Sequence, residues 1–436
     1  MVADDDELLC GFAVDILFGN YEVMQAVDGQ DGWEKARVFK PALAVIDLMM
    51  PRMHGYELCA LLKGPGGIPG IKVIVTSSKS FPADKDLAIK AGADAYLVKP
   101  YDAEALLAVA AKLLSGSAPA AAPAAAPKAE PAGVLKKTAP LDQASPGLPQ
   151  PVKVRFWGTR GSCPVAGPKT VRYGGNTACI ELRAGELLII FECGTGIREL
   201  GSSLMKEFAG RPIEGHIFVS HTHWDHIQGF PFFVPLYSPK NAFNIYSVHG
   251  AHGSLQSIFS GSMAADYFPI PLAGMAGRLR FIEMTRPADL GTAKVSFCHL
   301  NHPGLCIGFR VETQGRTITY LGDHEGFGRL SGDNEMSRRQ DADILEFARG
   351  SDLLIREAQY TEEEYALRKS WGHSTFDDVV RFGAASGAKR LVLFHHDPDH
   401  SDELMDKYSA YCRDLAAKAG SAMECSAASE GTCIEL

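Results

Sequence analysis

A stretch rich in Ala and Pro divides the chain into two parts that must fold separately. Residues 115–151 read SGSAPAAAPAAAPKAEPAGVLKKTAPLDQASPGLPQP and contain no aromatic side chain. A segment of this composition cannot bury enough apolar surface to fold, so it predicts an extended, semi-rigid spacer. We therefore expect one domain over residues 1–114, a linker over residues 115–151 and a second domain over residues 152–436.

The overall composition is that of a globular protein with no strong attraction to nucleic acid or membrane. The net charge is −9, and 46% of the residues are hydrophobic. No apolar run approaches the roughly 20 residues needed to span a bilayer, and the acidic start MVADDDELL does not read as a signal peptide. The 10 Cys form no C-x-x-C pair, so we expect reduced thiols and a cytoplasmic location.

The first part alternates strand-like and helix-like runs. The apolar runs EVMQAV, LAVID, KVIVTSS and AYLVKP are separated by the helical runs QDGWEKARVF, GYELCALLK and DKDLAIKAG, and DAEALLAVAAKLL follows the last of them. Alternation of this kind predicts an α/β fold in which helices cover both faces of a doubly wound, flavodoxin-like parallel sheet. In such sheets the functional site lies at the carboxyl ends of the strands.

Polar residues follow those predicted strands. Asp4 and Asp5 come after the first strand, Asp47 after the third, Ser77 after the fourth and Lys99 after the fifth. Clustered carboxylates are costly unless they bind a hard cation, and their oxygen atoms suit Mg²⁺. A lysine beside them can grip a phosphoryl group. Only three residues precede Asp4, so the first strand is predicted to be very short.

Residues 1–114 resemble the response-regulator receiver family. The loop DLMMPRMHGYEL, which begins at Asp47, and the pair Lys99–Pro100 carry the resemblance. The resemblance implies that an upstream sensor histidine kinase is the partner and that phosphorylation favours a homodimer. The alternative is a degenerate receiver that keeps the fold and is never phosphorylated. The implied roles are Asp47 as phosphoacceptor, Asp4, Asp5 and Asp47 as Mg²⁺ ligands, Ser77 and Lys99 as readers of the phosphate, and Tyr96 as the switch aromatic residue.

The second part contains the motif SHTHWDHIQG directly after the apolar strand HIFVS. It places His221, His223, Asp225 and His226 within six positions. Side chains two residues apart on an extended chain lie on the same face, so His221 and His223 can bind one metal ion together. Asp225 and His226 come after the chain has turned and can reach a second metal.

Further candidate ligands occur later in the sequence, two of them at the ends of predicted apolar strands. His302 lies in LNHPGL, Asp323 in ITYLGDHEG, and two histidines in RLVLFHHDPDH. We favour His395, because His396 would point to the opposite face of a continued strand. The predicted arrangement puts His302 with the first metal and His395 with the second, and Asp323 bridges the two. This mix of N and O ligands suits Zn²⁺, and Mn²⁺ or Fe stays open.

Residues 152–436 resemble the metallo-β-lactamase superfamily through the H-x-H-x-D-H motif. The resemblance implies an αββα sandwich. The stretch GHSTFDDVVRFGAASGAKRLVLFHH is similar to ribonuclease Z-like and cyclic-phosphate phosphodiesterases, which implies His373 as a proton donor and Glu357 as the residue that orients it. LLIREAQYT resembles the His-Glu-Ala-Thr motif of that group, but Arg356 and Gln359 replace its His and Thr. That departure argues against ribonuclease Z activity and leaves phosphodiester chemistry open.

Together these patterns predict a response regulator whose output domain is a binuclear metal-dependent phosphodiesterase. Asp225, His373 and Glu357 are the predicted catalytic residues, and the substrate is a small cyclic nucleotide or a related phosphodiester. The acidic composition disfavours long RNA, because basic side chains normally neutralise backbone phosphates. Two alternatives stay open: a metal-dependent lactone or thioester hydrolase, and a non-catalytic, metal-holding scaffold.

Overall fold

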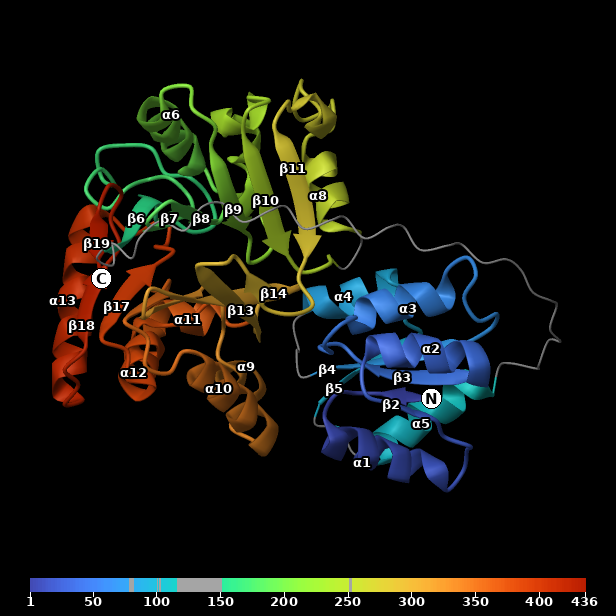
Figure 1. Ribbon diagram of the computed structural model, residues 1–436. Coiled ribbons are helices and arrows are strands. Elements are labelled where there is room, and N and C mark those ends of the chain that lie inside the picture. Colours follow the sequence, from blue (N-terminus) through green and yellow to red (C-terminus); the bar gives the residue numbers. More distant parts are fainter. Residues whose placement is uncertain (78–81, 100, 102, 116–150, 251–252) are drawn as a thin grey trace.

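The computed structural model describes the chain apart from residues 78–81, 100, 102, 116–150 and 251–252. Three β-sheets are present, one in the N-terminal part and two in the C-terminal part. Figure 1 shows the N-terminal part as a separate body beside the larger C-terminal part. No helix among the described residues is long and apolar enough to cross a membrane.

The N-terminal sheet has five parallel strands in the order β2-β1-β3-β4-β5. This is the doubly wound topology that the alternating runs predict. Strand β1 has only two residues, as expected from the short sequence before Asp4, and β2 is shorter than the run EVMQAV suggested. The elements are β1 (Val2–Ala3), α1 (Glu7–Phe18), β2 (Gln25–Ala26), α2 (Gly29–Phe39), β3 (Leu43–Asp47), α3 (Gly55–Lys63), β4 (Lys72–Ser77), α4 (Pro82–Lys90), β5 (Ala95–Val98) and α5 (Ala103–Leu114).

The C-terminal part begins with β6 and contains two mixed seven-stranded sheets. Their orders are β11-β10-β9-β8-β7-β6-β19 and β12-β13-β14-β15-β16-β17-β18. The first sheet comprises β6 (Val152–Gly158), β7 (Cys179–Ala184), β8 (Leu187–Phe191), β9 (Glu214–Phe218), β10 (Ala242–Ser247), β11 (Arg278–Glu283) and β19 (Cys433–Glu435). The second sheet comprises β12 (Ala288–Asp289), β13 (Ala293–Leu300), β14 (Cys306–Thr313), β15 (Arg316–Leu321), β16 (Leu353–Glu357), β17 (Arg390–Phe394) and β18 (Glu424–Ala427).

Helices cover the outer faces of both sheets, which gives the predicted αββα order of layers (Figure 1). Strands such as β8 (LLIIF) and β17 (RLVLF) are almost continuously apolar because both of their faces are buried. The α-helices are α6 (Ile197–Phe208), α7 (Trp224–Ile227), α8 (Leu255–Ser262), α9 (Phe327–Ser331), α10 (Glu335–Phe347), α11 (Glu362–Arg368), α12 (Phe376–Ser386) and α13 (Asp402–Lys418), and the 3-10 helices are η1 (Phe230–Phe232), η2 (Val234–Tyr237) and η3 (Leu272–Gly274).

The central core lies between the two C-terminal sheets. Phe191 of β8 stacks on Phe309 of β14 with ring centroids 5.8 Å apart, so the contact joins one sheet to the other. Separate apolar clusters fill the space under the outer helices. This close packing makes the strand ends rigid supports for the polar loops that follow them.

The boundaries of the two domains remain a proposal. The last element of the parallel sheet domain, α5, ends at Leu114, and β6 begins at Val152. Most of the predicted linker lies outside the described residues.

Candidate metal centre

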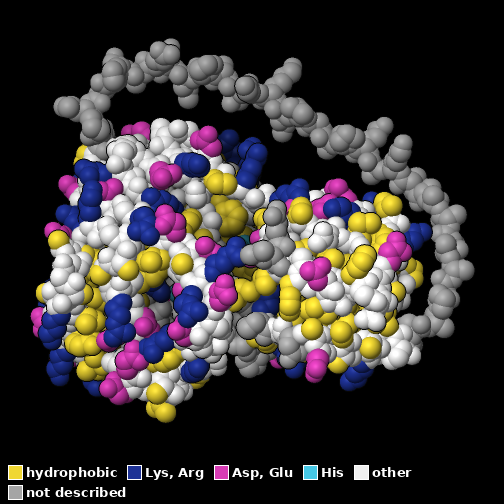
Figure 2. Space-filling view, turned by 90° about the horizontal axis from the view of Figure 1, so that it is seen from below, with side chains coloured by type: hydrophobic (Ala, Val, Ile, Leu, Met, Phe, Trp, Pro, Cys, Tyr) yellow, Lys and Arg dark blue, Asp and Glu magenta, His cyan; other side chains and the backbone are white. Residues whose placement is uncertain are grey.

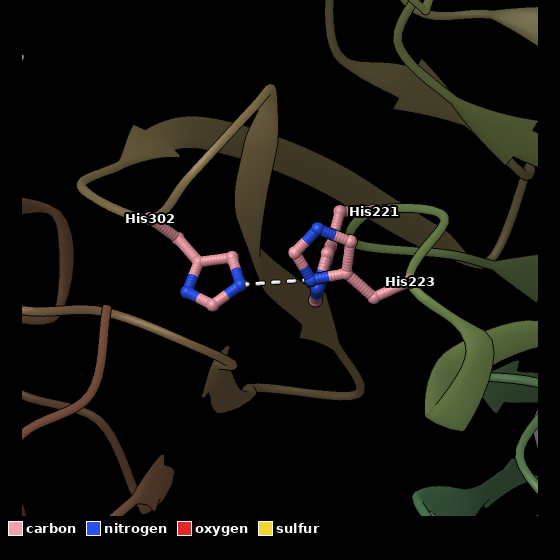
Figure 3. A group of neighbouring side chains, drawn as sticks. All are labelled: His221, His223 and His302. Atoms are coloured by element: carbon pink, nitrogen blue, oxygen red, sulfur yellow. Dashed lines mark hydrogen bonds between the residues drawn. The ribbon is translucent and has the colours of Figure 1, made fainter. Parts of the chain in front are cut away.

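Three histidines from two loops meet at one edge of the sandwich, and we call them the first ligand group. His221 and His223 follow β9, whereas His302 lies between β13 and β14. Figure 3 shows the rings of His221 and His223 turned toward that of His302. Nε2 of His302 lies 3.1 Å from Nδ1 of His223, and the rings of His221 and His302 have centroids 4.7 Å apart. One nitrogen from each residue lies within 4.8 Å of the others, which is close enough to hold one metal ion.

The second ligand group consists of Asp225, His226 and His395. Asp225 and His226 lie in the short helix α7, and His395 directly follows β17. Oδ2 of Asp225 lies 3.0 Å from Nε2 of His395 and 3.4 Å from Nε2 of His226. Burial opposes the charge on Asp225, but His226 and His395 outweigh it and hold the pKa of this carboxyl well below its usual value. The group therefore offers an ionised carboxylate and two imidazoles.

Asp323 lies between the two groups. It follows β15 and is almost completely buried. Its Oδ2 atom is 3.6 Å from Nε2 of both His221 and His302, and its Oδ1 atom is 3.3 Å from Nε2 of His395. One carboxylate thus faces both ligand groups, which is the position expected of a bridging ligand.

The donor atoms fit divalent cations better than they fit a metal-free hydrogen-bond network. Among the described residues, Nε2 of His221, Nε2 of His226 and Oδ1 of Asp323 are buried and have no hydrogen-bonding partner. Burial, helped by neighbouring histidines, lowers the pKa of His221 well below its ordinary value, and burial does the same for His302. Neutral imidazoles with buried lone pairs are metal ligands, and leaving them unsatisfied would be costly. These residues would hold two divalent cations.

The backbone turns sharply at His395. Strand β17 ends at Phe394, and His395 has a φ of 60°, which is unusual for a residue other than Gly. This turn aims His395 at the ligands, whereas Nε2 of His396 lies 2.8 Å from the carbonyl of Ala428 on another side. The structure therefore brings His395, and not His396, next to the other candidate ligands, and the physical reason is the left-handed turn and not a continued strand.

Three residues that the sequence analysis did not assign to the site hold the ligands in place. Nδ1 of His302 lies 2.9 Å from the carbonyl of Gly372, and Nδ1 of His395 lies 3.1 Å from Oε1 of Gln359. Oε2 of Glu192 lies 3.3 Å from Nδ1 of His226. Such partners fix the orientation of an imidazole ligand. The only signal in the sequence was Gln359, which stands where the related motif has Thr.

His373 and Glu357 lie next to the ligand groups. The His373 ring is 5.2 Å from that of His302, and its Nδ1 lies 3.8 Å from Oε2 of Glu357. Burial lowers the pKa of His373 to about 4 and raises that of Glu357 well above its usual value. Among the described residues, neither Oε2 of Glu357 nor Nδ1 of His373 makes a hydrogen bond. A nitrogen of His373 also lies within 4.8 Å of ligand atoms of His302 and Asp323.

Arg356 lies on the opposite side of β16 from the metal ligands. Its guanidinium stacks on Phe382 of α12, 3.9 Å from the ring centroid, in the layer under the outer helices. Neighbouring residues of a strand point to opposite faces, so Arg356 cannot replace a ligand or a proton donor. The departure from the related motif at position 356 therefore leaves the candidate site unchanged.

The N-terminal domain gathers a second acidic group. Asp4, Asp5 and Asp47 each offer an oxygen within 4.8 Å of the others, and Nζ of Lys99 lies 2.6 Å from both Asp4 and Asp47. Burial, followed by repulsion from Asp47, raises the pKa of Asp4 to about 6 and that of Asp5 to about 7. Three carboxylates that repel one another suit a divalent cation.

The predicted switch residues lie beside this acidic group. Ser77 ends β4 and is completely buried, and its side chain hydrogen-bonds to that of Tyr96 in β5. Their assignment as readers of a phosphate stays a prediction. Pro100 of the Lys–Pro pair lies outside the described residues.

The described residues thus form a parallel-sheet domain with an acidic group and an αββα sandwich with a candidate metal centre. Residues 1–111 match the family model described as response regulator receiver domain, and residues 189–396 match the model described as beta-lactamase superfamily domain. The chain therefore consists of a response regulator receiver domain followed by a domain of the metallo-β-lactamase fold, as both resemblances implied. Below, these are the receiver domain and the hydrolase domain.

Individual relatives resemble one domain or the other. The response regulator ArlR of Staphylococcus aureus is 36% identical over 109 residues, which is 25% of this chain and 48% of the relative. The chain thus spans about half the length of this curated relative. The metallo-β-lactamase fold protein YhfI of Bacillus subtilis covers 66% of this chain and 99% of its own, with 19% identity and a TM-score of 0.47. A diphosphatase from the PhnP family covers 66% and 98%, with 16% identity and a TM-score of 0.46.

Proposed function

We propose that the hydrolase domain is a binuclear metal-dependent phosphodiesterase acting on a small cyclic nucleotide or a related phosphodiester. The observation that carries this proposal is the position of Asp323 between two complete ligand groups. Two cations held that close together would activate a water molecule and neutralise the charge of a phosphodiester. A phosphodiester gains from such a site because negative charge develops on its oxygens in the transition state.

The residues of the chain supply positioning and proton transfer. Asp225 and Asp323 carry negative charge into a buried site, and Ser162 holds Asp225 by donating its backbone N–H to Oδ2 at 2.8 Å. Nδ1 of His373 and Oε2 of Glu357 lie 3.8 Å apart and would have to approach before a proton of the carboxyl could pass to Nδ1 while Nε2 gives its proton to the departing oxygen. Glu357 is kept in place by the backbone N–H of Ser374, which donates to Oε1 at 2.7 Å. This relay accounts for a neutral His373 acting as a proton donor.

Two exposed tryptophans beside the ligands favour a substrate with an aromatic base. Trp224 directly follows His223 and is 61% exposed; Trp371 directly precedes Gly372 and is 60% exposed. Large exposed indoles offer flat surfaces on which a nucleobase can stack. On the face seen in Figure 2, basic and acidic side chains are intermixed and form no continuous basic surface. The intermixed charge on that face favours a small nucleotide over a long RNA.

We further propose that a sensor histidine kinase phosphorylates Asp47 and that the receiver domain controls the hydrolase domain. The acidic group around Asp47, its contact with Lys99 and the match to the receiver family support this role. Zn²⁺ is the proposed metal of the hydrolase domain, because its ligands are mostly imidazoles, and Mg²⁺ is proposed for the receiver.

The test is hydrolysis of bis(p-nitrophenyl) phosphate by the full chain loaded with Zn²⁺ or Mn²⁺. Wild type is compared with Asp225→Ala and with Asp414→Ala, which removes an exposed carboxylate from α13 of the same domain. We expect metal-dependent turnover in wild type and Asp414→Ala, and a loss of at least about 100-fold in Asp225→Ala. Firm metal binding without turnover in wild type would refute the phosphodiesterase and direct attention to lactones, thioesters or a scaffold role.

A further inference from the structure

The loop that carries His302 is held from two sides, and one of those sides belongs to the receiver domain. Within the hydrolase domain, Nδ1 of His302 lies 2.9 Å from the carbonyl of Gly372. From the receiver domain, Asp84 of α4 accepts a hydrogen bond from the backbone N–H of Gly304, with Oδ1 3.0 Å from the nitrogen. Figure 1 shows α4 on the side of the receiver domain that faces the hydrolase domain. A metal ligand is thus two residues from a bond between domains.

Asp84 is itself fixed in the receiver domain. Its side chain is completely buried, and the same Oδ1 atom accepts a hydrogen bond from the hydroxyl of Tyr56 at 3.0 Å. Tyr56 is only 1% exposed and belongs to the apolar core of the receiver domain. A buried carboxylate that accepts two hydrogen bonds of 3.0 Å is a directional anchor.

The loop also packs against the receiver domain through apolar contact. Leu305, the residue after Gly304, lies against the receiver core cluster that contains Tyr56. Gly304 has a φ of 81°, a conformation that glycine adopts without strain and other residues rarely adopt, so the turn depends on glycine at this position. At the same junction, the His54 ring of the receiver meets His299 of β13 edge to face at 4.8 Å. The contact therefore extends from the loop to the strand that precedes it.

The second ligand group has its described supports within the hydrolase domain. Asp225 accepts from the backbone of Ser162, and His395 pairs with Gln359. Neither contact involves the receiver domain. The loop of the first ligand group therefore contacts the receiver domain, whereas the described supports of the second ligand group do not.

We propose that Asp84 is a positioning residue of the metal centre, so that the receiver domain completes the first ligand group by holding the loop of His302. This inference rests on the metal centre of the proposed function and adds to it a residue from the other domain. Removing the acceptor would break the bond that fixes the partly buried N–H of Gly304 to the receiver domain, and the loop would shift. The imidazole of His302 would no longer be oriented toward the other ligands. The metal ion held by the first ligand group would then bind more weakly than the metal ion held by the second.

Cobalt binding to the full-length protein tests this role without relying on turnover. The metal-free protein is titrated with Co²⁺, the visible absorption of the bound ion is followed, and bound metal is counted by equilibrium dialysis. The variants are Asp84→Ala, which removes the acceptor, and Asp84→Asn, which keeps an acceptor oxygen at the same place. The matched control is Asp86→Ala, an exposed carboxylate two residues further along α4.

We expect wild type, Asp84→Asn and Asp86→Ala to bind two ions with similar spectra. In Asp84→Ala one of the two ions should bind roughly 10- to 100-fold more weakly, with an altered spectrum, while the other is unchanged. If Asp84→Ala binds each of the two ions with the affinity of wild type, the proposal is overturned. If Asp84→Ala does not fold, Asp84→Glu moves the acceptor by one methylene group, and unchanged cobalt binding in that variant would overturn it equally. Firm binding of two ions by a wild type that hydrolyses no phosphodiester would refute only the phosphodiesterase.

Discussion

Glu192 and His226 face each other beneath the metal centre, with Oε2 of Glu192 lying 3.3 Å from Nδ1 of His226. Both residues are completely buried, and both carboxylate oxygens of Glu192 also accept from the backbone N–H of Ser220 at 3.2 Å. Glu192 has a φ of 67°, so its backbone takes a conformation that is costly for a residue with a side chain. At Glu192 the orientation of His226, a candidate ligand, therefore outweighs the strain of the backbone.

Replacing Glu192 by Gln should weaken metal binding at the second ligand group. The amide keeps the size of the side chain but loses the charge that polarises the imidazole of His226. We expect about a tenfold loss of affinity for one Zn²⁺ ion, with the fold retained. Competition with a chromogenic chelator measures it, and Glu186→Gln, a change in the turn between β7 and β8, is the control. Unchanged affinity would show that Glu192 supports only the backbone of Ser220.

Adding a single methyl group at Gly161 should displace His395. A Cβ atom at this position would lie 2.3 Å from Nδ1 of His395, and the imidazole cannot easily yield because Asp225 and Gln359 hold it from two sides. We expect Gly161→Ala to lower phosphodiester turnover at least tenfold at saturating metal. Gly261→Ala, where a Cβ would meet no atom within 4 Å, should match wild type. Wild-type turnover in Gly161→Ala would argue against His395 as a ligand.

Removing Trp371 should affect binding of a nucleotide more than its chemical conversion. Loss of a stacking surface costs about 1–3 kcal/mol per base, so Trp371→Ala should raise KM for a cyclic nucleotide roughly 5- to 100-fold. Steady-state kinetics should show kcat within about twofold of wild type, and Trp371→Phe should recover part of the loss. Leu367→Ala, at a side chain that is 83% exposed, is the control. An unchanged KM would remove Trp371 from the substrate site.

Lys99 should stabilise the receiver domain most strongly when Mg²⁺ is absent. Its ammonium lies 2.6 Å from Asp4 and from Asp47, and all three side chains are buried. Removing one partner from a buried pair leaves uncompensated charge, so Lys99→Ala should lower the stability of this domain by about 3 kcal/mol. Urea unfolding followed by tyrosine and tryptophan fluorescence measures it, with Lys85→Ala as the exposed control. Millimolar Mg²⁺ should recover part of the loss, and a loss that is independent of Mg²⁺ would argue against cation binding.

Chelation of metal should destabilise the hydrolase domain. Among the described residues, Nε2 of His221, Nε2 of His226 and Oδ1 of Asp323 are buried and make no hydrogen bond, so the metal-free site keeps polar atoms whose burial is unfavourable. Adding Zn²⁺ at about 100 times its Kd should stabilise the domain by about 2.7 kcal/mol per site. Thermal unfolding with and without EDTA measures the shift. Identical melting curves would contradict the metal centre.

Features that depend on residues close together in the chain could be predicted from the sequence. The alternation of strands and helices predicts the parallel sheet of the receiver domain, because the turn and burial preferences of each run are local. The spacing of His221, His223, Asp225 and His226 indicates a pair of ligand groups, because four such residues follow one strand within a few positions. Asp323 and His395, two further candidate ligands, each end an apolar run, and strand ends that lie at one edge of a sandwich meet there.

Only the tertiary structure decided how those residues support one another. Asp323 faces both ligand groups, and Glu192 and Gln359 orient histidines that are far away in the sequence, because strand register and the left-handed turn at His395 set these distances. The bond from Asp84 to Gly304 spans 220 residues and two domains, and no periodicity encodes it. Local sequence determined which side chains stand at the strand ends, whereas packing of sheets and domains determined which of them meet.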